Sequence, residues 1–408
     1  MSKLQELIKE LCPEGVEFRK LGEIGIFTRG NGLQKKDFVE SGVGCIHYGQ
    51  IYTYYGLYTN KTKSFVSKDL SLKLTKVRKG DLIIACTSEN IEDVCKAVAW
   101  LGDDEIVTGG HACVFSHKEN PKYISYFFQT EILFQQKKKY ARGTKVIDIK
   151  VSDLEKIEIP LPPLEVQNEI VRILDTFTSH AAELQAELQA RKEQYEYYRN
   201  KLLTFDENDE GVKWMKLGEI CDILTGFPFD SSKFVAEGIR LMRGVNIKRG
   251  MLDFNEEINR YWDNSEGLEK YILEENDIVI SMDGSLVGKS FAVILKEHLP
   301  LLLVQRVARL RSASVNIKYV YFNITNSFSE YVDKVKTKGA IPHISLKDIS
   351  NFMIPVPPLS EQQRIVSILD KFESLVNDLT AGLPAEIAAV QEQYEYYRNK
   401  LLTFKRIS

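Results

Sequence analysis

Side chains that can read base edges or hold phosphates are concentrated in a few short stretches of this 408-residue sequence. Arginine, lysine, asparagine and glutamine hydrogen-bond base edges in the grooves of DNA, and basic or polar side chains on loops anchor phosphates. The first half of the chain contains the candidates Arg29, Asn31, Gln34, Lys35, Lys36, His47, Tyr48, Gln50, Lys137, Lys138, Lys139, Arg142 and Lys145. The second half contains Arg240, Arg243, Asn246, Lys248, Arg249, Lys334, Lys336 and Lys338.

A run of charged side chains is often only a solvated surface, and this interpretation stays open for each stretch. Their placement favours binding. Three lysines at 137–139 lie just before Gly143, and lysines at 334, 336 and 338 lie just before Gly339, which is 196 residues further on. A basic cluster before a glycine in both halves of the chain indicates a shared role.

Motifs for catalysis are missing from the sequence. It has no phosphate-binding Gly-x-x-x-x-Gly-Lys-Ser/Thr loop, no His-Glu-x-x-His metal pair and no Gly-x-Ser-x-Gly nucleophile elbow. The two Pro-Pro pairs follow Leu161 and Val356, so neither belongs to the Asp/Asn-Pro-Pro-aromatic motif of methyltransferases. The six cysteines have no metal-binding or redox spacing and are expected to be reduced and structural. We expect a non-catalytic chain, and binding of S-adenosylmethionine or DNA cleavage by the chain alone would contradict this.

Composition and charge limit the possible functions further. The hydrophobic fraction of 44% and the charged fraction of 27% are those of a globular protein. No run of 18 apolar residues and no signal-peptide core is present, so we expect no membrane contact and a cytoplasmic location. Residues 1–150 hold 23 basic against 18 acidic residues, and residues 206–350 hold 19 against 22. A nucleic-acid binder with this balance needs its cations on one face, or phosphate contacts from a partner.

The chain consists of two copies of one unit. Gln194–Phe205 recurs unchanged at Gln393–Phe404, and Lys20–Ile24 recurs as Lys216–Ile220. The offsets are 199 and 196 residues, so one copy is about 196 residues long. An internal repeat of this kind decides the architecture, because each copy must fold as a similar unit.

The two copies differ most where the candidate binding residues lie. Thr28–Thr59 has little in common with Leu224–Asn255, whereas the flanking landmarks agree closely. One scaffold therefore carries two different variable surfaces.

Each copy is expected to begin with a mixed α/β domain of about 150 residues. Short apolar runs beside Gly, Asn and Asp, such as Asp81–Ala85 and Asp277–Ser281, predict buried strands. Amphipathic patterns predict a helix near Tyr123–Gln136 and its counterpart near Tyr319–Val335.

Each copy is expected to end in a long helix. Pro160–Pro163 and Pro355–Pro358 mark the boundaries, because proline continues neither a helix nor a central strand. One helix should begin after Leu164, and the other at Ser360, which forms a capping-box pattern with Gln363. Apolar residues from position 166 to 205 recur every three or four residues, which predicts a coiled-coil stripe along about 60 Å of helix.

The two long helices are expected to cover each other's apolar stripes, lying antiparallel around a pseudo-two-fold axis. The second helix has four extra residues, among which Gly382 and Pro384 predict a kink or break. Residues 11–18 and 206–214 lie in matching places before the two domains, so we expect the chain ends to lie close together.

Tyrosine is enriched near the end of each long helix. The two groups are Tyr195, Tyr197, Tyr198 and Tyr394, Tyr396, Tyr397. Their helical spacing favours helix packing or partner docking over stacking on bases.

The repeat, the Tyr-rich helix ends and the Pro-Pro-Leu-x-x-Gln elements (Pro162–Gln167 and Pro357–Gln362) resemble the specificity subunits of type I restriction-modification systems. The resemblance covers nearly the whole chain. It implies an α+β fold with two tandem target-recognition domains, each followed by a spacer helix, the helices pairing as an antiparallel coiled coil. The domains would be 1–160 and 206–356, and the spacer helices 161–205 and 357–408.

The same resemblance implies the ligand and the partners. The ligand would be double-stranded DNA with a split, asymmetric target, one half-site for each recognition domain. The partners would be two modification (methyltransferase) subunits and the restriction (endonuclease/translocase) subunits, which would bring S-adenosylmethionine, ATP and Mg²⁺, so that this chain itself holds no cofactor. A coiled-coil adaptor that binds only proteins is the alternative, although it has little need of two different variable surfaces.

Overall fold

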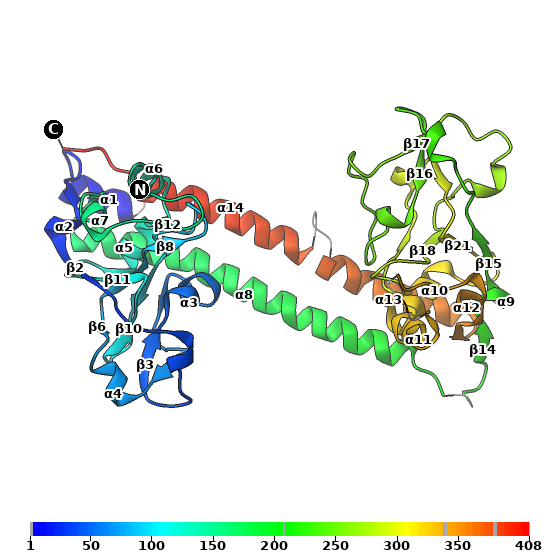
Figure 1. The fold of residues 1–408 in the computed structure, drawn as a ribbon, viewed down its shortest axis with the longest axis horizontal. Coiled ribbons are helices and arrows are strands. Elements are labelled where there is room, and N and C mark those ends of the chain that lie inside the picture. The colour runs from blue at the N-terminus through cyan, green and yellow to red at the C-terminus, as the bar shows by residue number, and fades with distance from the viewer. Residues whose placement is uncertain (1–2, 207–208, 338, 340, 378–381, 408) are drawn as a thin grey trace. The chain divides into compact units, whose positions relative to one another are not determined.

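The computed structural model describes residues 3–206, 209–337, 339, 341–377 and 382–407. The chain forms two compact units (Figure 1). Unit 1 comprises Met1–Gln185 with Glu386–Ser408, and unit 2 comprises Ala186–Ala385. Each unit therefore contains one globular domain and segments of both spacer regions.

The domain of unit 1 is built on two sheets. The larger sheet has the order β2-β11-β7-β9-β4, and the smaller has the order β5-β3-β10-β6. The strands of the larger sheet are β2 (Gly25–Arg29), β4 (Tyr58–Thr59), β7 (Leu82–Ala85), β9 (Ala97–Trp100) and β11 (Ala112–His117). Those of the smaller are β3 (Val43–Ile46), β5 (Ser64–Val66), β6 (Thr75–Val77) and β10 (Ile106–Thr108). All four residues of β7 are apolar and buried, as the sequence predicted.

Shorter elements complete unit 1. Two small antiparallel pairs join β1 (Phe18–Lys20) to β13 (Glu158–Pro160) and β8 (Thr87–Ser88) to β12 (Ile147–Asp148). The short helices are α1 (Lys3–Leu11), α2 (Leu21–Ile24), η1 (Lys35–Asp37), α3 (Tyr48–Thr53), α4 (Lys68–Ser71) and α7 (Val151–Leu154).

Unit 2 repeats this scaffold with fewer regular strands. Its sheets have the orders β15-β21-β18-β19, β17-β16-β20 and β14-β22. The strands are β14 (Lys213–Lys216), β15 (Asp222–Thr225), β16 (Ile239–Met242), β17 (Tyr261–Trp262), β18 (Ile278–Ser281), β19 (Phe291–Val293), β20 (Leu301–Leu303), β21 (Val307–Arg311) and β22 (Met353–Val356). The short helices are α9 (Leu217–Ile220), η2 (Ser231–Lys233), η3 (Gly244–Asn246), η4 (Glu269–Tyr271), η5 (Lys296–His298) and α12 (Leu346–Asn351).

Isolated bridges in unit 2 replace strand pairs of unit 1. The bridged pairs are Ile272 with Leu302, Arg249 with Phe291, and Asp283 with His343. They correspond to the pairs β6–β10, β4–β9 and β12–β8 of unit 1. The two domains therefore have the same topology although their sequences diverge.

The helix predicted near Tyr123–Gln136 is two helices, α5 (Pro121–Phe127) and α6 (Glu131–Tyr140). The Thr130 side chain accepts a hydrogen bond from the Leu133 N–H and caps α6, which restarts the helix there. In unit 2 the counterpart runs through α10 (Ile317–Asn323), the π-helical η6 (Ile324–Phe328) and α11 (Ser329–Val335). The prediction of one helix therefore fits unit 2 better than unit 1.

The long helices are α8 (Leu164–Leu203), α13 (Leu359–Asn377) and α14 (Leu383–Leu401). Helix α13 begins one residue earlier than predicted, so Ser360 lies inside its first turn. The Pro358 carbonyl accepts hydrogen bonds from the N–H groups of Glu361 and Gln362. Residues 378–381, part of the region where we predicted a kink or break, lie outside the described residues. Helix α14 starts just after Gly382 with Pro384 in its first turn, where a missing N–H breaks no helical bond.

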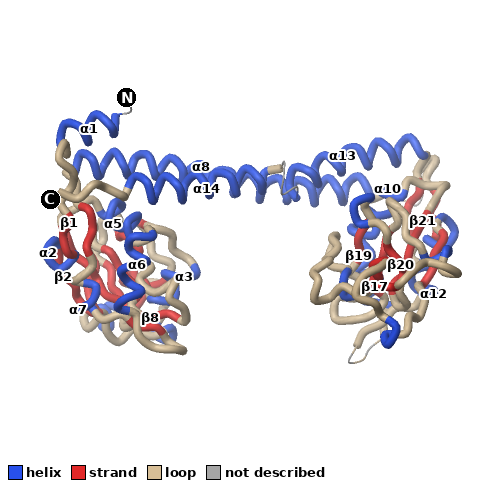
Figure 2. The backbone as a smooth tube through the Cα atoms, turned by 90° about the horizontal axis from the view of Figure 1, so that it is seen from above, coloured by secondary structure: helices blue, strands red, loops and turns tan. Residues whose placement is uncertain are grey.

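Within each unit, helical segments from the two spacer regions pack together. In unit 1, α8 and α14 lie side by side (Figure 2) and run in opposite directions, as the colours of Figure 1 show. The rings of Phe177 and Tyr397 stack at 5.3 Å. In unit 2, the rings of Tyr198 and Phe372 stack at 5.6 Å in the same way. The expected proximity of the chain ends is confirmed in unit 1, where Val16 bridges Arg406.

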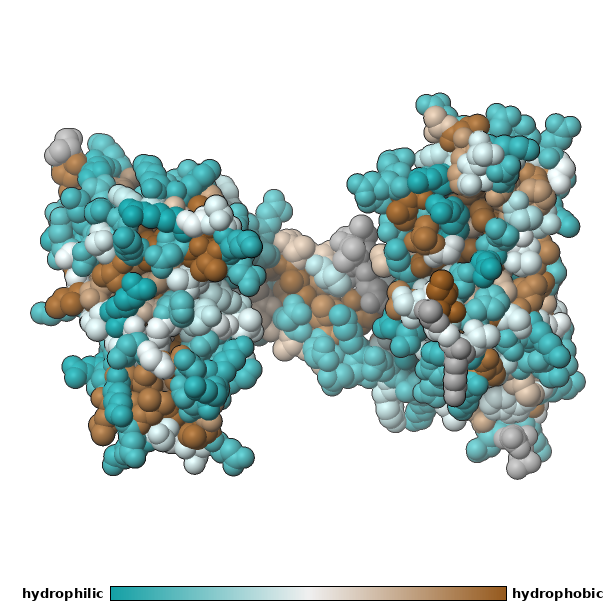
Figure 3. All heavy atoms as spheres, viewed as in Figure 1, coloured by the Kyte–Doolittle hydropathy of each residue, from teal (hydrophilic) through white to brown (hydrophobic). Residues whose placement is uncertain are grey.

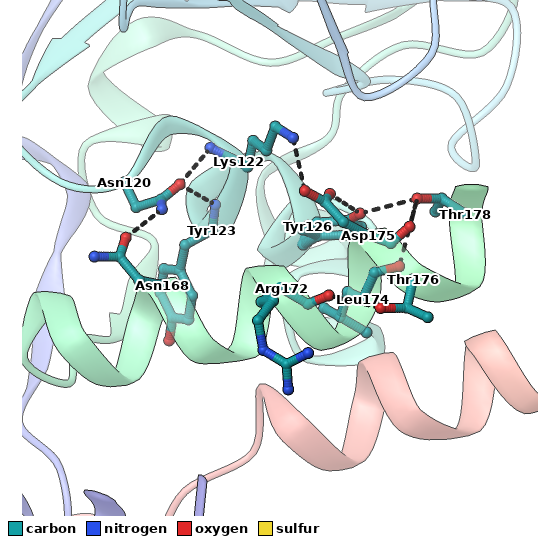
Figure 4. Close-up of polar contacts among 10 residues, drawn as sticks. All are labelled: Asn120, Lys122, Tyr123, Tyr126, Asn168, Arg172, Leu174, Asp175, Thr176 and Thr178. Carbon is teal, nitrogen blue, oxygen red and sulfur yellow. Dashed lines mark hydrogen bonds and ion pairs between the residues drawn. The ribbon is translucent and has the colours of Figure 1, made fainter. Parts of the chain in front are cut away.

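A set of polar contacts attaches the globular domain of unit 1 to α8 (Figure 4). On α5, the Lys122 ammonium lies 2.7 Å from the Asp175 carboxylate of α8, and the Tyr126 hydroxyl donates to the same carboxylate at 2.8 Å. In unit 2 the ion pair recurs between Lys318 and Asp370 at 2.8 Å. Both domains are therefore held on their helices by the same kind of contact.

The Pro-Pro-Leu-x-x-Gln elements fix where each helix begins. The Gln167 amide is fully buried, donates to the Pro162 carbonyl at 2.8 Å and accepts from the Asn120 N–H at 3.1 Å. Gln362 makes the same two bonds in unit 2, to the Pro357 carbonyl and from the Asn316 N–H. One side chain thus joins the start of the spacer helix to the start of the helix that packs on it.

Replacing this glutamine should destabilise its unit. A Gln167→Ala change leaves the Asn120 N–H and the Pro162 carbonyl buried without partners, so we expect the free energy of unfolding to fall by about 2–4 kcal/mol. Urea denaturation of the full chain measures the loss. Gln185→Ala, an exposed site on the same helix, is the control, and equal effects of the two changes would contradict the role of Gln167.

Candidate nucleic-acid interface

Several loops of the unit 1 domain meet at one edge of the larger sheet. Strands β2 and β7 end there and β11 begins there, because Cys113 pairs with Arg29 on one side and with Ile84 on the other. The loops that follow β2 and β7, the turn before β11 and helix α3 lie at this edge, which we call the loop edge. A rigid sheet that presents several loops together is a common arrangement for binding sites.

Helix α3 is attached to the loop edge by aromatic residues. The Tyr52 hydroxyl donates to the Thr87 carbonyl at 2.6 Å, and the Tyr48 ring lies 5.0 Å from the His111 ring. His47 caps the helix by accepting from the Gly49 N–H at 3.1 Å. His47 is buried, and this burial lowers the pKa of its imidazole, which favours the neutral form near pH 7.

Three predicted contact residues are structural instead. Lys137 is 4% exposed and its ammonium donates to the carbonyls of Glu92 and Val94 at 2.8 and 2.7 Å. Asn246 is fully buried, and both atoms of its side-chain amide are bonded inside its own loop. The Gln50 amide is likewise used internally, accepting from the backbone and donating to the Ser64 hydroxyl at 2.7 Å. The polar atoms of these three side chains are already bonded within their domains, which argues against their contacting DNA.

Other candidates have partners but remain partly exposed. The ion pairs are Arg142 with Asp153, Lys248 with Asp253, and Lys336 with Asp333. The Arg243 guanidinium donates to the Ile258 carbonyl, the Arg240 guanidinium lies over the Phe254 ring, and Asn31 bonds the Lys73 carbonyl. Gln34 is exposed at the start of η1.

The cations that remain are the best candidates for phosphate contacts. They are exposed, and no ion pair is present for them in the part of the chain that the structure describes. The set is Arg29, Lys35, Lys36, Lys138, Lys139, Lys145, Arg249 and Lys334. Lys338, also predicted, lies outside the described residues. Polar side chains cover most of the visible face of each domain, with separate apolar patches (Figure 3).

The two glycines that follow the lysine clusters, Gly143 and Gly339, do not occupy matching backbone positions. Gly143 has φ +106° and a Cβ there would lie 2.0 Å from the Val146 carbonyl oxygen, so glycine is required. The Arg142 N–H bonds the Asp148 carbonyl, and in unit 2 the Thr337 N–H bonds the His343 carbonyl. These two matching hydrogen bonds are 195 residues apart in the sequence, whereas Gly143 and Gly339 are 196 residues apart. The two loops match even though the two glycines do not.

Sequence reasoning missed one pair of positions at the loop edge. His111 and Arg306, 195 residues apart, both have positive φ, +66° and +65°. Each is exposed, immediately precedes the long strand β11 or β21, and contacts a side chain on the neighbouring strand segment. In the sequence, His111 and Arg306 are single residues outside any basic or polar cluster. They are recognised as a pair only when the two copies are aligned by their strands.

The described residues hold no cluster of three or more His, Cys, Asp or Glu side chains suited to a metal ion. All six cysteines are buried as free thiols, as expected. Among the helices of the described ranges, none has both the length and the apolar character needed to span a membrane.

Comparison with known proteins decides the family. A family profile described as the type I restriction modification DNA specificity domain matches residues 13–193 and 209–389, one match for each copy of the repeat. The chain belongs to this specificity family. The resemblance inferred from the repeat and the Pro-Pro-Leu-x-x-Gln elements is thereby confirmed.

Curated members of the specificity family align with large parts of the chain. The specificity subunit of the Escherichia coli enzyme EcoR124I/EcoR124II is 37% identical over 274 residues, covering 62% of this chain and 64% of the relative. A putative type I specificity subunit of Haemophilus influenzae, S.HindORF215P, is 32% identical over 308 residues, 72% of this chain and 75% of the relative. The E. coli EcoAI specificity subunit matches over 42% of this chain and 30% of its own length at 36% identity. The chain thus spans less than two thirds of the two E. coli relatives.

Solved structures of the specificity family share the fold. The type I S subunit from M. genitalium superposes with a TM-score of 0.56 at 15% identity, covering 95% of this chain and 96% of its own. The HsdS subunit from Thermoanaerobacter tengcongensis gives a TM-score of 0.52 at 19% identity, covering 96% and 97%. The predicted fold of two tandem α/β domains, each followed by a long helix, is confirmed. The relatives are named specificity subunits, in agreement with a non-catalytic chain.

Proposed function

We propose that this chain is the DNA-reading subunit of a type I restriction-modification enzyme and binds a split, asymmetric target in double-stranded DNA, one half-site for each domain. The observation that carries the proposal is one topology with two different loop edges. The register places Arg29 at the end of β2 and Thr225 at the same point of β15. His47, which caps α3, corresponds to Arg243, which precedes η3. Different side chains on the same backbone suit the reading of two different base sequences.

The exposed cations of the two domains are assigned to phosphates. Lys35, Lys36, Lys138 and Lys139 are free to contact the DNA backbone, and such contacts position a protein without reading sequence. The net charge of −3 means that the whole chain attracts DNA weakly. Partner subunits would therefore supply part of the phosphate contacts.

The spacer helices are assigned two roles, to set the distance between half-sites and to dock partners. Helix α8 alone has 40 residues, which is about 60 Å of helix. Its C-terminal segment repeats without change at the end of α14, and in both places the same face is exposed. Tyr197 and Tyr396 are 60% and 57% exposed, with the ammonium groups of Lys201 and Lys400 over their rings.

Two identical exposed faces suit two identical partners. The family implies that these are modification subunits carrying S-adenosylmethionine, joined by restriction subunits that use ATP and Mg²⁺. The adaptor alternative also needs docking faces, but it leaves the divergence of the loop edges without a purpose.

Salt dependence of DNA binding by the assembled complex tests the proposal. We expect sequence-selective binding whose logarithmic slope against salt falls by about 2 when Lys138 and Lys139 are both changed to Ala, since each phosphate contact contributes roughly 0.9 to that slope. Fluorescence anisotropy with specific and random duplexes measures it. Lys79→Ala, an exposed cation paired with Asp103, is the control. Binding without sequence preference would favour the adaptor.

A further inference from the structure

The turn before β11 and its counterpart before β21 have the same strained backbone in both domains. His111 and Arg306 lie at φ +66° and +65°, a region that side chains other than glycine rarely adopt. The carbonyls of both residues accept from the strand segment alongside, His111 from the Cys86 N–H at 2.8 Å and Arg306 from the Met282 N–H at 2.9 Å. Backbone strain at an exposed residue is common at functional sites, so the side chains on these two turns are candidates for a functional role.

In unit 1 the side chain on this turn has neutral polar neighbours. The His111 Nδ1 lies 3.1 Å from the Thr87 hydroxyl, and the Tyr48 ring packs against the imidazole at 5.0 Å. Thr87 is buried, so the imidazole is held by one side while the rest of the ring faces solvent. The three side chains form a cluster from α3, β8 and the turn.

In unit 2 the three matching positions hold charged groups and a glycine. The Arg306 guanidinium donates to the Asp283 carboxylate at 3.1 Å, and Arg306 is 64% exposed. Gly244 takes the place of Tyr48, and a Cβ there would lie 2.8 Å from the Ser281 hydroxyl and 3.9 Å from the Asp283 carboxylate. The absent side chain leaves room for the ion pair, so all three positions differ between the two domains.

We propose that Tyr48–Thr87–His111 and Gly244–Asp283–Arg306 are the base-reading centres of the two domains, and that Arg306 reads a guanine in the second half-site. The inference rests on the proposed function and assigns its specificity to three positions in each domain. An arginine fork matches the two acceptors O6 and N7 of guanine, and Asp283 orients that fork from behind. A histidine makes single hydrogen bonds, so the first centre reads a different base.

Glycine substitutions on the turn test the proposal. Arg306→Gly removes the side chain and relieves the positive-φ strain. A loss of base preference in this variant can therefore not be attributed to a less stable fold. The complete chain, assembled with its modification subunit, is used to select duplexes from a randomised DNA pool. We expect the preference for one base pair of the second half-site to fall by about ten- to a hundred-fold, with the first half-site unchanged and the melting temperature equal or higher.

His111→Gly should have the mirror effect, the loss of one base preference in the first half-site only. Lys289→Ala, an exposed cation of unit 2 outside the cluster, is the control and should change no preference. Unchanged base preferences in both glycine variants, or a lower melting temperature without loss of preference, would overturn the base-reading assignment. If the unaltered complex selects no split motif at all, the proposed function itself fails, which is a separate result.

Discussion

A chain in which Leu217–Phe352 is replaced by Leu21–Ile157 should recognise the first half-site twice. The exchange removes the second loop edge and supplies the first, while α8, α13 and α14 stay unchanged. The ends of the two segments are matched, because the N–H of Leu21 bonds the Ile157 carbonyl at 2.9 Å and the N–H of Leu217 bonds the Phe352 carbonyl at 2.9 Å. Methylation mapping by long-read sequencing, in cells that supply the modification subunit, measures the new target.

The transplanted domain should pack on α13 without further substitutions. Lys122 would meet Asp370, as Lys318 does now, and the strand pair β14–β22 below the exchange is unaltered. The reciprocal exchange, Leu217–Phe352 in place of Leu21–Ile157, is the matched control and should give the second half-site twice. Persistence of the original asymmetric motif after either exchange would show that bases are read elsewhere. The orientation of the doubled half-sites would also reveal how the two domains are related on DNA.

Changing Tyr197 and Tyr396 to glutamate should remove partner subunits one at a time. Each single variant is expected to retain one modification subunit and the double variant none, because the two exposed faces are identical in sequence. A charge in place of an exposed interface tyrosine typically weakens binding by at least about 2 kcal/mol, roughly thirty-fold. Native mass spectrometry of the complex counts the bound subunits.

Lys192→Glu is the control for charge, since it is exposed on α8 just before the repeated segment. It should leave both partners bound. Retention of two modification subunits by the double tyrosine variant would contradict the docking assignment. Tyr195 and Tyr394 are not suitable sites, because both are buried: the Tyr195 ring lies against Phe372 of α13, and the Tyr394 ring lies against Tyr126 of α5.

The architecture of this protein could be read from its sequence. The unchanged segment Gln194–Phe205 and the Pro-Pro-Leu-x-x-Gln elements established the repeat, the positions of the helices and the family. The buried strands β7 and β18 were predicted correctly, because a run of apolar residues beside Asp81 or Asp277 needs no distant information. Local patterns are sufficient where the structure depends on neighbours in the chain.

The choice among the candidate binding residues depended on tertiary structure. Lys137 belongs to a run of three lysines, yet its ammonium is buried against carbonyls some 45 residues earlier, which no local pattern shows. His111 and Arg306 gave no signal as single residues, and became a pair only when the strands of two diverged domains were aligned. The physical reason is that burial and hydrogen-bond partners come from segments far apart in the chain. The sequence by itself determined the scaffold and its duplication, and the tertiary structure decided which of the cations on that scaffold are exposed and without an ion pair among the described residues.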